Sequence, residues 1–128
     1  MSEQKVERET VVSASLEEVW QALTDETLLE EWLAPEVELE PREGGEVSVR
    51  TEDGEERTGT VEEFDEGRRL AFRWGREGVG QSRVELTVDA VAGGARVVVV
   101  ETGPALAPGA GWGPRLAALR SASTLALA

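Results

Sequence analysis

The strongest strand pattern in the sequence is Ser82-Arg-Val-Glu-Leu-Thr-Val-Asp89, followed by Gly93-Gly94 and Arg96-Val-Val-Val-Val-Glu101. In the first segment every second residue is charged or polar, which is typical of a strand with one buried and one solvated face. The glycine pair predicts a turn, and the valine run is apolar on both faces. A strand of that kind has neighbours on both sides or a helix packed across it. The pattern leaves open which face of residues 96–101 points inward.

After this hairpin the sequence predicts a closing helix. Residues 103–113 are rich in Gly, Pro and Ala and form a predicted loop, while Pro114 suits the first turn of a helix. The predicted buried stripe of this helix has the expected spacing and consists of Trp112, Leu116, Leu119 and Ser123 or Leu127.

Before Ser82 the sequence predicts four strands with a period of two. Asp53-Gly54 is the strongest hairpin-turn signal, and it separates the second and third of these four strands. The residues expected on the inner faces are Val37 and Leu39, Val47 and Val49, alternate residues of 57–64, and Leu70, Phe72 and Trp74.

The first third of the chain predicts one strand and two short helices. Residues 5–12 form the strand, and Ser15-Leu-Glu-Glu18 has the pattern of a capping box at the start of a helix. Asp25 is placed to cap a second helix, which buries Leu28, Leu29, Trp32 and Leu33 and ends at Pro35. Residues 1–128 are therefore expected to form one α+β domain, with a seven-stranded antiparallel sheet and a long C-terminal helix.

The net charge of −13 is distributed unevenly along the chain. Residues 1–66 contain 22 of the 26 acidic side chains, whereas residues 67–128 contain 8 Arg against 4 acids. Two interpretations stay open: acidic segments pair with Arg-bearing ones inside the domain, or the charge separation steers a cationic partner. The negative charge argues against binding to nucleic acid or to an anionic membrane, because both reward clustered Lys and Arg.

The absence of three residue types limits the chemistry. Without His, Cys or Tyr the chain has no His-based triad, no thiolate nucleophile and no zinc site built on His or Cys. The acidic clusters 52–56 and 62–66 lack the spacing of a calcium loop, so we expect no metal site. The charged start of the chain does not resemble a signal peptide, and the longest apolar runs are too short to span a membrane. These features predict a cytoplasmic location.

The order of elements resembles the START/polyketide-cyclase superfamily, and within it the branch named after the activator of the heat-shock-protein ATPase. The resemblance spans nearly the whole chain, and its segments are Ser15-Leu-Glu-Glu-Val-Trp-Gln-Ala-Leu-Thr-Asp25, Leu29, Trp32, Gly59-Thr-Val61, Leu70-Ala-Phe-Arg-Trp74, Ser82-Arg-Val-Glu-Leu-Thr-Val88, Glu101-Thr-Gly103, Gly111-Trp112, Leu116 and Leu119. It implies a helix-grip fold, in which a curved seven-stranded sheet wraps around the C-terminal helix. Members of the superfamily include ligand carriers, hormone receptors, cyclases, co-chaperone domains and antibiotic-sequestering proteins.

The same resemblance implies a cavity between the sheet and the closing helix. The residues expected to line it are Trp32, Val61, Glu63, Phe72, Trp74, Val84, Leu86, Trp112 and Leu116. For each Trp among them the alternative role is packing in the core. For Glu63 the alternative is an ion pair with an Arg near the sheet edge. The orientation of Glu101 is open, and Ser82 either hydrogen-bonds at the cavity wall or faces water.

The leading functional prediction is therefore the binding of a small, largely apolar ligand, without a cofactor and without catalytic residues, by a monomer or a homodimer. A first alternative is a stress-related, co-chaperone-like interaction domain whose acidic half docks on a basic protein partner. A second is a cyclase-type or hydrolase-type enzyme that relies on Glu63, Glu101 or Arg57 in a desolvated pocket.

Overall fold

The computed structural model describes residues 3–76, 80–104, 106 and 108–127, and the side chains of these residues except 108–109 and 123–127. Its seven strands form one antiparallel sheet in the order β1-β7-β6-β5-β4-β3-β2. The strands are β1 (Gln4–Val12), β2 (Glu36–Leu39), β3 (Glu46–Arg50), β4 (Glu56–Asp65), β5 (Arg69–Arg76), β6 (Gly80–Val91) and β7 (Gly94–Gly103). The helices are α1 (Leu16–Thr24), α2 (Glu26–Leu29), the 3-10 turn η1 (Pro108–Gly111) and α3 (Trp112–Leu127). The expected α+β arrangement is confirmed.

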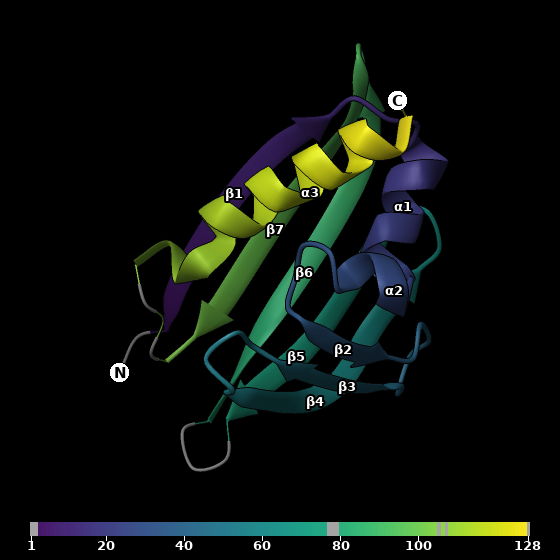
Figure 1. Ribbon diagram of the computed structural model, residues 1–128. Helices are drawn as coiled ribbons and strands as arrows, with labels where there is room; N and C mark the ends of the chain where they lie inside the picture. The colour runs from purple at the N-terminus through teal and green to yellow at the C-terminus, as the bar shows by residue number, and fades with distance from the viewer. Residues whose placement is uncertain (1–2, 77–79, 105, 107, 128) are drawn as a thin grey trace.

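All three α-helices pack against one face of the sheet (Figure 1). The long helix α3 lies over β1 and β7, and α1 contacts α3 as well as β6 and β7. The hydrophobic core fills the space between these helices and the sheet. Within the described part of the chain, no helix is both long and apolar enough to cross a membrane.

Local signals for the first two helices are confirmed in the structure. Ser15 caps α1, because its Oγ accepts from the Glu18 amide at 3.1 Å while the Glu18 side chain reaches back to Ser15. Asp25 caps α2 through the Thr27 amide at 2.9 Å. This second helix is shorter than expected, so Trp32 and Leu33 are buried in the turns that follow it rather than on the helix itself.

The inward face of β7 is decided by its pairing with β6. Val84 of the alternating strand pairs with Glu101, so the inner residues of β7 are Ala95, Val97, Val99 and Glu101. Val98 and Val100 lie on the outer face and are half-buried. The strand also continues to Gly103, into the segment that the sequence predicted as loop.

A bulge in β4 changes the face on which Glu63 lies. Val61 pairs with Phe72, but the register with β5 then shifts, and Glu63 pairs with Ala71. The extra residue turns Glu63 to the outer face of the sheet. Phe64 takes the following inner position, where its ring lies 5.6 Å from that of Trp20.

The closing helix begins at Trp112, so Pro114 lies in its first turn as expected. Trp112, Leu116 and Leu119 form its buried stripe. The predicted continuation of this stripe at Ser123 or Leu127 concerns side chains outside the described set.

Candidate functional site

One buried carboxylate, that of Glu101, connects two strands and the closing helix. Its side chain is 2% exposed, and its Oε2 accepts from Trp74 Nε1 at 2.9 Å and from Ser82 Oγ at 2.5 Å. Its Oε1 accepts from Trp112 Nε1 at 2.9 Å. An indole N–H can only donate, so both tryptophans require an acceptor at this point. The Glu101 carboxylate therefore accepts from all three neighbouring side chains and holds them in place.

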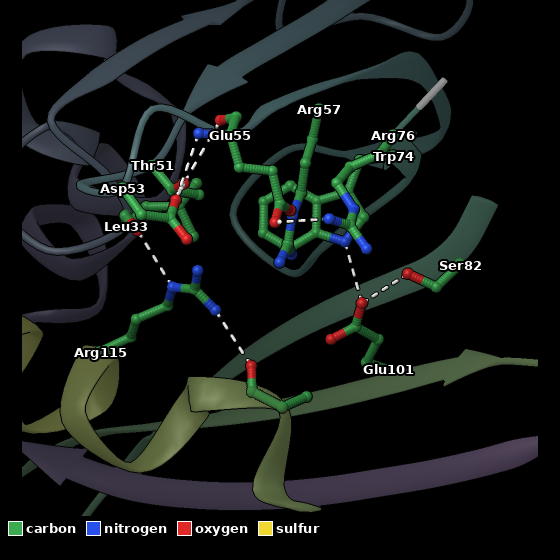
Figure 2. A network of polar contacts seen from close by, with 11 residues as sticks. Leu33, Thr51, Asp53, Glu55, Arg57, Trp74, Arg76, Ser82, Glu101 and Arg115 are labelled. Carbon is green, nitrogen blue, oxygen red and sulfur yellow. Dashed lines mark hydrogen bonds and ion pairs between the residues drawn. The ribbon is translucent and has the colours of Figure 1, made fainter. Parts of the chain in front are cut away.

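Strand register explains why these groups meet. Trp74 and Ser82 are paired across β5 and β6, and Glu101 on β7 is paired with Val84, two residues further along β6. All three side chains therefore lie on the inner face, and Figure 2 shows Glu101 between Trp74 and Ser82. Among the described residues, Ser82 and Glu101 are the buried polar side chains.

Two guanidinium groups lie against the same indole ring. The Arg57 guanidinium carbon is 4.7 Å from the centre of the Trp74 ring, and that of Arg115 is 5.6 Å from it. Arg115 also lies 5.1 Å from the Trp112 ring, which stacks on Trp74 with ring centres 6.0 Å apart and planes inclined by 21°. Cations placed over tryptophan faces are attracted by the ring quadrupole.

Backbone carbonyl groups hold Arg115 in this position. Its Nε donates to the Leu33 carbonyl at 3.0 Å and its Nη1 to the Ala110 carbonyl at 3.1 Å. Figure 2 shows the Arg115 side chain extending from α3 toward Leu33. Burial and the nearby charge of Arg57 lower the pKa of Arg115, whereas Glu101 and Glu55 act in the opposite direction. An arginine stays protonated at any physiological pH, so this position holds a partly desolvated positive charge.

Glu55, just after the turn between β3 and β4, binds two of the neighbouring arginines. Its Oε1 lies 2.5 Å from Arg57 Nε, and its Oε2 lies 3.4 Å from Arg76 Nη1. The Glu55 and Arg57 side chains are mostly buried, while Arg76 is about half exposed. Glu55 therefore shares its single negative charge between Arg57 and Arg76 and orients both side chains.

An open hollow of about 410 Å³ adjoins this network at the end of the sheet, next to η1. We call it the Trp74 hollow, and its described lining is Glu55, Arg57, Trp74, Gly75, Arg76, Gly80, Gln81, Ser82, Glu101, Pro104, Leu106, Ala110, Gly111 and Arg115. A second space of about 710 Å³, the Trp32 hollow, lies between residues 30–35, residues 51–57 and the start of α3. The two hollows share Glu55, Arg57, Gly111 and Arg115, so they meet at the two guanidinium groups.

The structure separates the predicted cavity residues into two groups. Trp74 lines the Trp74 hollow and Trp32 lines the Trp32 hollow. The Nε1 of Trp32 is engaged in the core, where it donates to the Ala22 carbonyl at 2.8 Å. The other apolar candidates lie in the packed core and line neither hollow: Val61, Phe72, Val84, Leu86, Trp112 and Leu116. Trp112 stacks on Trp74, and both rings are buried between the start of α3 and the sheet.

The cavity role predicted for Glu63 is wrong. On the outer face its carboxylate lies 3.3 Å from Arg69 Nη1 and 3.2 Å from Arg83 Nη2. The alternative considered for it, an ion pair with arginine, is the arrangement observed. The neighbouring Glu62 pairs with Arg73 at 2.7 Å and with Arg83 at 2.9 Å, so acidic β4 is joined to Arg-bearing β5 and β6.

Sequence reasoning missed Arg115, Arg76 and Glu55 as members of the site. The available signal for Arg115 was a cation next to the buried stripe of an otherwise apolar helix segment, three residues after Trp112. Glu55 stood within an acidic cluster that looked solvated. In the described ranges no three acidic side chains are grouped as metal ligands would be.

Comparison with known proteins identifies relatives of this fold. The family model described as "Activator of Hsp90 ATPase homolog 1-like protein" matches residues 13–117. No curated protein matches the chain.

Several solved structures are similar. DynU16, a protein of the dynemicin biosynthetic locus, is 26% identical with a TM-score of 0.81, over 91% of this chain and 46% of DynU16, so the chain spans about half the length of that relative. CalU16 from Micromonospora echinospora is 24% identical with a TM-score of 0.74, over 92% of this chain and 82% of CalU16. The Aha1 dimer from Colwellia psychrerythraea, solved in solution, is 15% identical with a TM-score of 0.80, over 94% of this chain and 96% of that one. Because the family model covers residues 13–117, most of its length, the protein belongs to the activator of Hsp90 ATPase homolog 1-like family.

Proposed function

We propose that the chain binds a small organic molecule in the Trp74 hollow. The observation that carries this proposal is an open space of about 410 Å³ whose wall is held in place by the buried Glu101 network. Small-molecule sites typically have volumes of about 300–1,000 Å³ and combine apolar surface with a few fixed polar groups. The Trp74 hollow has both, since Pro104, Leu106 and Ala110 line it together with three arginines.

Family membership supports binding as the kind of function, and the geometry refines the kind of ligand. The sequence predicted a largely apolar molecule beneath the closing helix. In the structure six of the predicted lining residues lie in the packed core and line neither hollow, and the hollow at the end of the sheet is lined by three arginines. A molecule with an apolar body and a polar end fits this lining better than a hydrocarbon-like ligand does.

Isothermal titration calorimetry with small aromatic probes tests the proposal. We would titrate the purified chain with 2-naphthoate and with 2-naphthamide, and then repeat the titrations with L106W. Leu106 lines the Trp74 hollow, so the larger indole should fill the space and abolish saturable binding. The matched control is V11W, because Val11 is an exposed apolar residue on β1 that lines neither hollow. Binding that L106W leaves intact, or no binding of either probe to the unmodified chain, would contradict the proposal.

A further inference from the structure

The charges in the Trp74 hollow do not balance. The described lining contains three arginines, Arg57, Arg76 and Arg115, and two carboxylates, Glu55 and Glu101. Glu55 forms ion pairs with both Arg57 and Arg76. Glu101 is already occupied by three donors, and each of these is a neutral group. The lining therefore carries one positive charge in excess.

Arg115 is the arginine of this lining that no described carboxylate pairs with. Its two hydrogen bonds go to backbone carbonyl groups, and within the described part of the chain no carboxylate forms an ion pair with it. Taking a charge out of water is costly unless a counter-charge and hydrogen bonds compensate. The adjacent Arg57 increases this cost, because its like charge disfavours the protonated form of Arg115.

The Arg115 side chain also keeps hydrogen-bonding capacity toward the hollow. Nε and Nη1 are engaged, whereas no described residue accepts from Nη2. No enclosed side-chain nitrogen or oxygen among the described residues lacks a partner, so Nη2 has access to open space. Arg115 lines both hollows at their junction, and this places its free donors where a ligand could reach them.

We propose that the ligand carries a single carboxylate, which binds Arg115 beside Arg57 while its apolar body lies in the Trp74 hollow. This inference rests on the proposed function and specifies the class of ligand. The planar guanidinium fork matches a carboxylate, and such charge-assisted hydrogen bonds are the stronger kind. A monoanion balances the single excess charge, whereas a phosphate dianion would overcompensate it and approach Glu55 and Glu101.

The two probes already named separate this inference from the proposed function. 2-Naphthoate and 2-naphthamide have nearly the same shape and differ in charge. We expect the carboxylate to bind the unmodified chain about tenfold more tightly or better, because hydrogen bonds to a charged partner are roughly twice as strong as neutral ones. Added salt should weaken binding of the carboxylate and leave the amide little changed. Equal affinities would overturn the carboxylate inference while the proposed function stood, and failure of both probes to bind would overturn the two together.

Arginine variants test where the carboxylate of the ligand binds. R115M should remove most of the preference for naphthoate over naphthamide, and R115K should keep part of it, because the charge remains and the fork is lost. The matched control is R96M, since Arg96 pairs with Asp89 and Glu9 and lines neither hollow. Circular dichroism would establish that each variant is folded. If R115M does not fold, R57M tests the other member of the adjacent pair of guanidinium groups. An undiminished preference in a folded R115M variant would overturn the assignment.

Discussion

Replacing Glu101 by Gln changes one atom and should destabilise the protein strongly. Trp112 donates to Oε1, whereas Trp74 and Ser82 donate to Oε2. An amide offers one acceptor oxygen, so its NH₂ group must face at least one indole N–H. The better orientation keeps the oxygen toward Trp74 and Ser82 and leaves the Trp112 donor unpaired in the core.

The magnitude follows from these three contacts. An unpaired buried donor costs about 1–3 kcal/mol, and the two remaining bonds lose their charge assistance at about 1 kcal/mol each. Removing the charge recovers part of the desolvation cost of a carboxylate that is 2% exposed. We expect a net loss of about 2–4 kcal/mol in the free energy of unfolding, or roughly 10 °C in melting temperature.

Urea unfolding followed by tryptophan fluorescence measures this loss, and a double-mutant cycle identifies its source. W112F removes the donor that the amide would oppose, so E101Q should cost about 1–2 kcal/mol less in the W112F background. The matched control is E85Q on the outer face of β6, where an ion pair of Glu85 with Arg83 should contribute at most about 1 kcal/mol. A cost of E101Q that is the same in both backgrounds, or no larger than that of E85Q, would refute the reasoning.

Three further outcomes are expected. Hydrogen bonding to Arg73 lowers the pKa of Glu62 below its ordinary value of 4.5. Its carboxylate therefore stabilises the fold above pH 4.5 and stops doing so as the pH falls through the lowered pKa. The gap in melting temperature between the unmodified chain and E62Q should narrow in acid, and a constant gap would contradict this. In G59A the new Cβ would lie 1.7 Å from the Arg73 carbonyl oxygen, so urea unfolding should show a loss of about 2 kcal/mol or more, and tolerance of the methyl group would refute the close approach of β4 and β5. S15A should cost about 1 kcal/mol by the same measurement through loss of the α1 cap, and an unchanged midpoint would show that the cap contributes nothing.

The elements that the sequence predicted well are those with local signals. A capping box needs only Ser15 and the residue three positions later, and the alternation from Ser82 to Asp89 is readable within one strand. A turn glycine is also a local signal, because it is needed at one backbone position. Gly93, for example, has a φ of 86°, which other residues rarely adopt. Each of these features appears in the structure at or near its predicted position.

Orientation along two other strands was not readable from the sequence, for two different physical reasons. The run Val97–Val100 has no alternation, so only its register with β6 shows that Glu101 points inward. In β4 the alternation is present, but the bulge after Val61 reverses it and carries Glu63 outward. Both features depend on a neighbouring strand, and strand register is a non-local property that a single sequence does not display.

The location of the hollow follows from how the tryptophans are held. Trp112 at the start of α3 and Trp74 on β5 are tied to the same carboxylate and stack on each other. This arrangement packs the two rings between the start of α3 and the sheet, and the Trp74 hollow lies beside them at the end of the sheet, where arginines reach the tryptophan faces.

The uneven charge of the chain then has two different consequences. On the outer face, Glu62 and Glu63 of β4 are paired with arginines of β5 and β6, so part of the charge separation along the sequence is cancelled by pairing. At the junction of the hollows, Arg115 comes from the closing helix, and in the described part of the chain no acidic strand supplies it with a partner. A chain with a net charge of −13 thus keeps a positive group facing a hollow, and it is this local charge, rather than the net charge, that a bound molecule would meet.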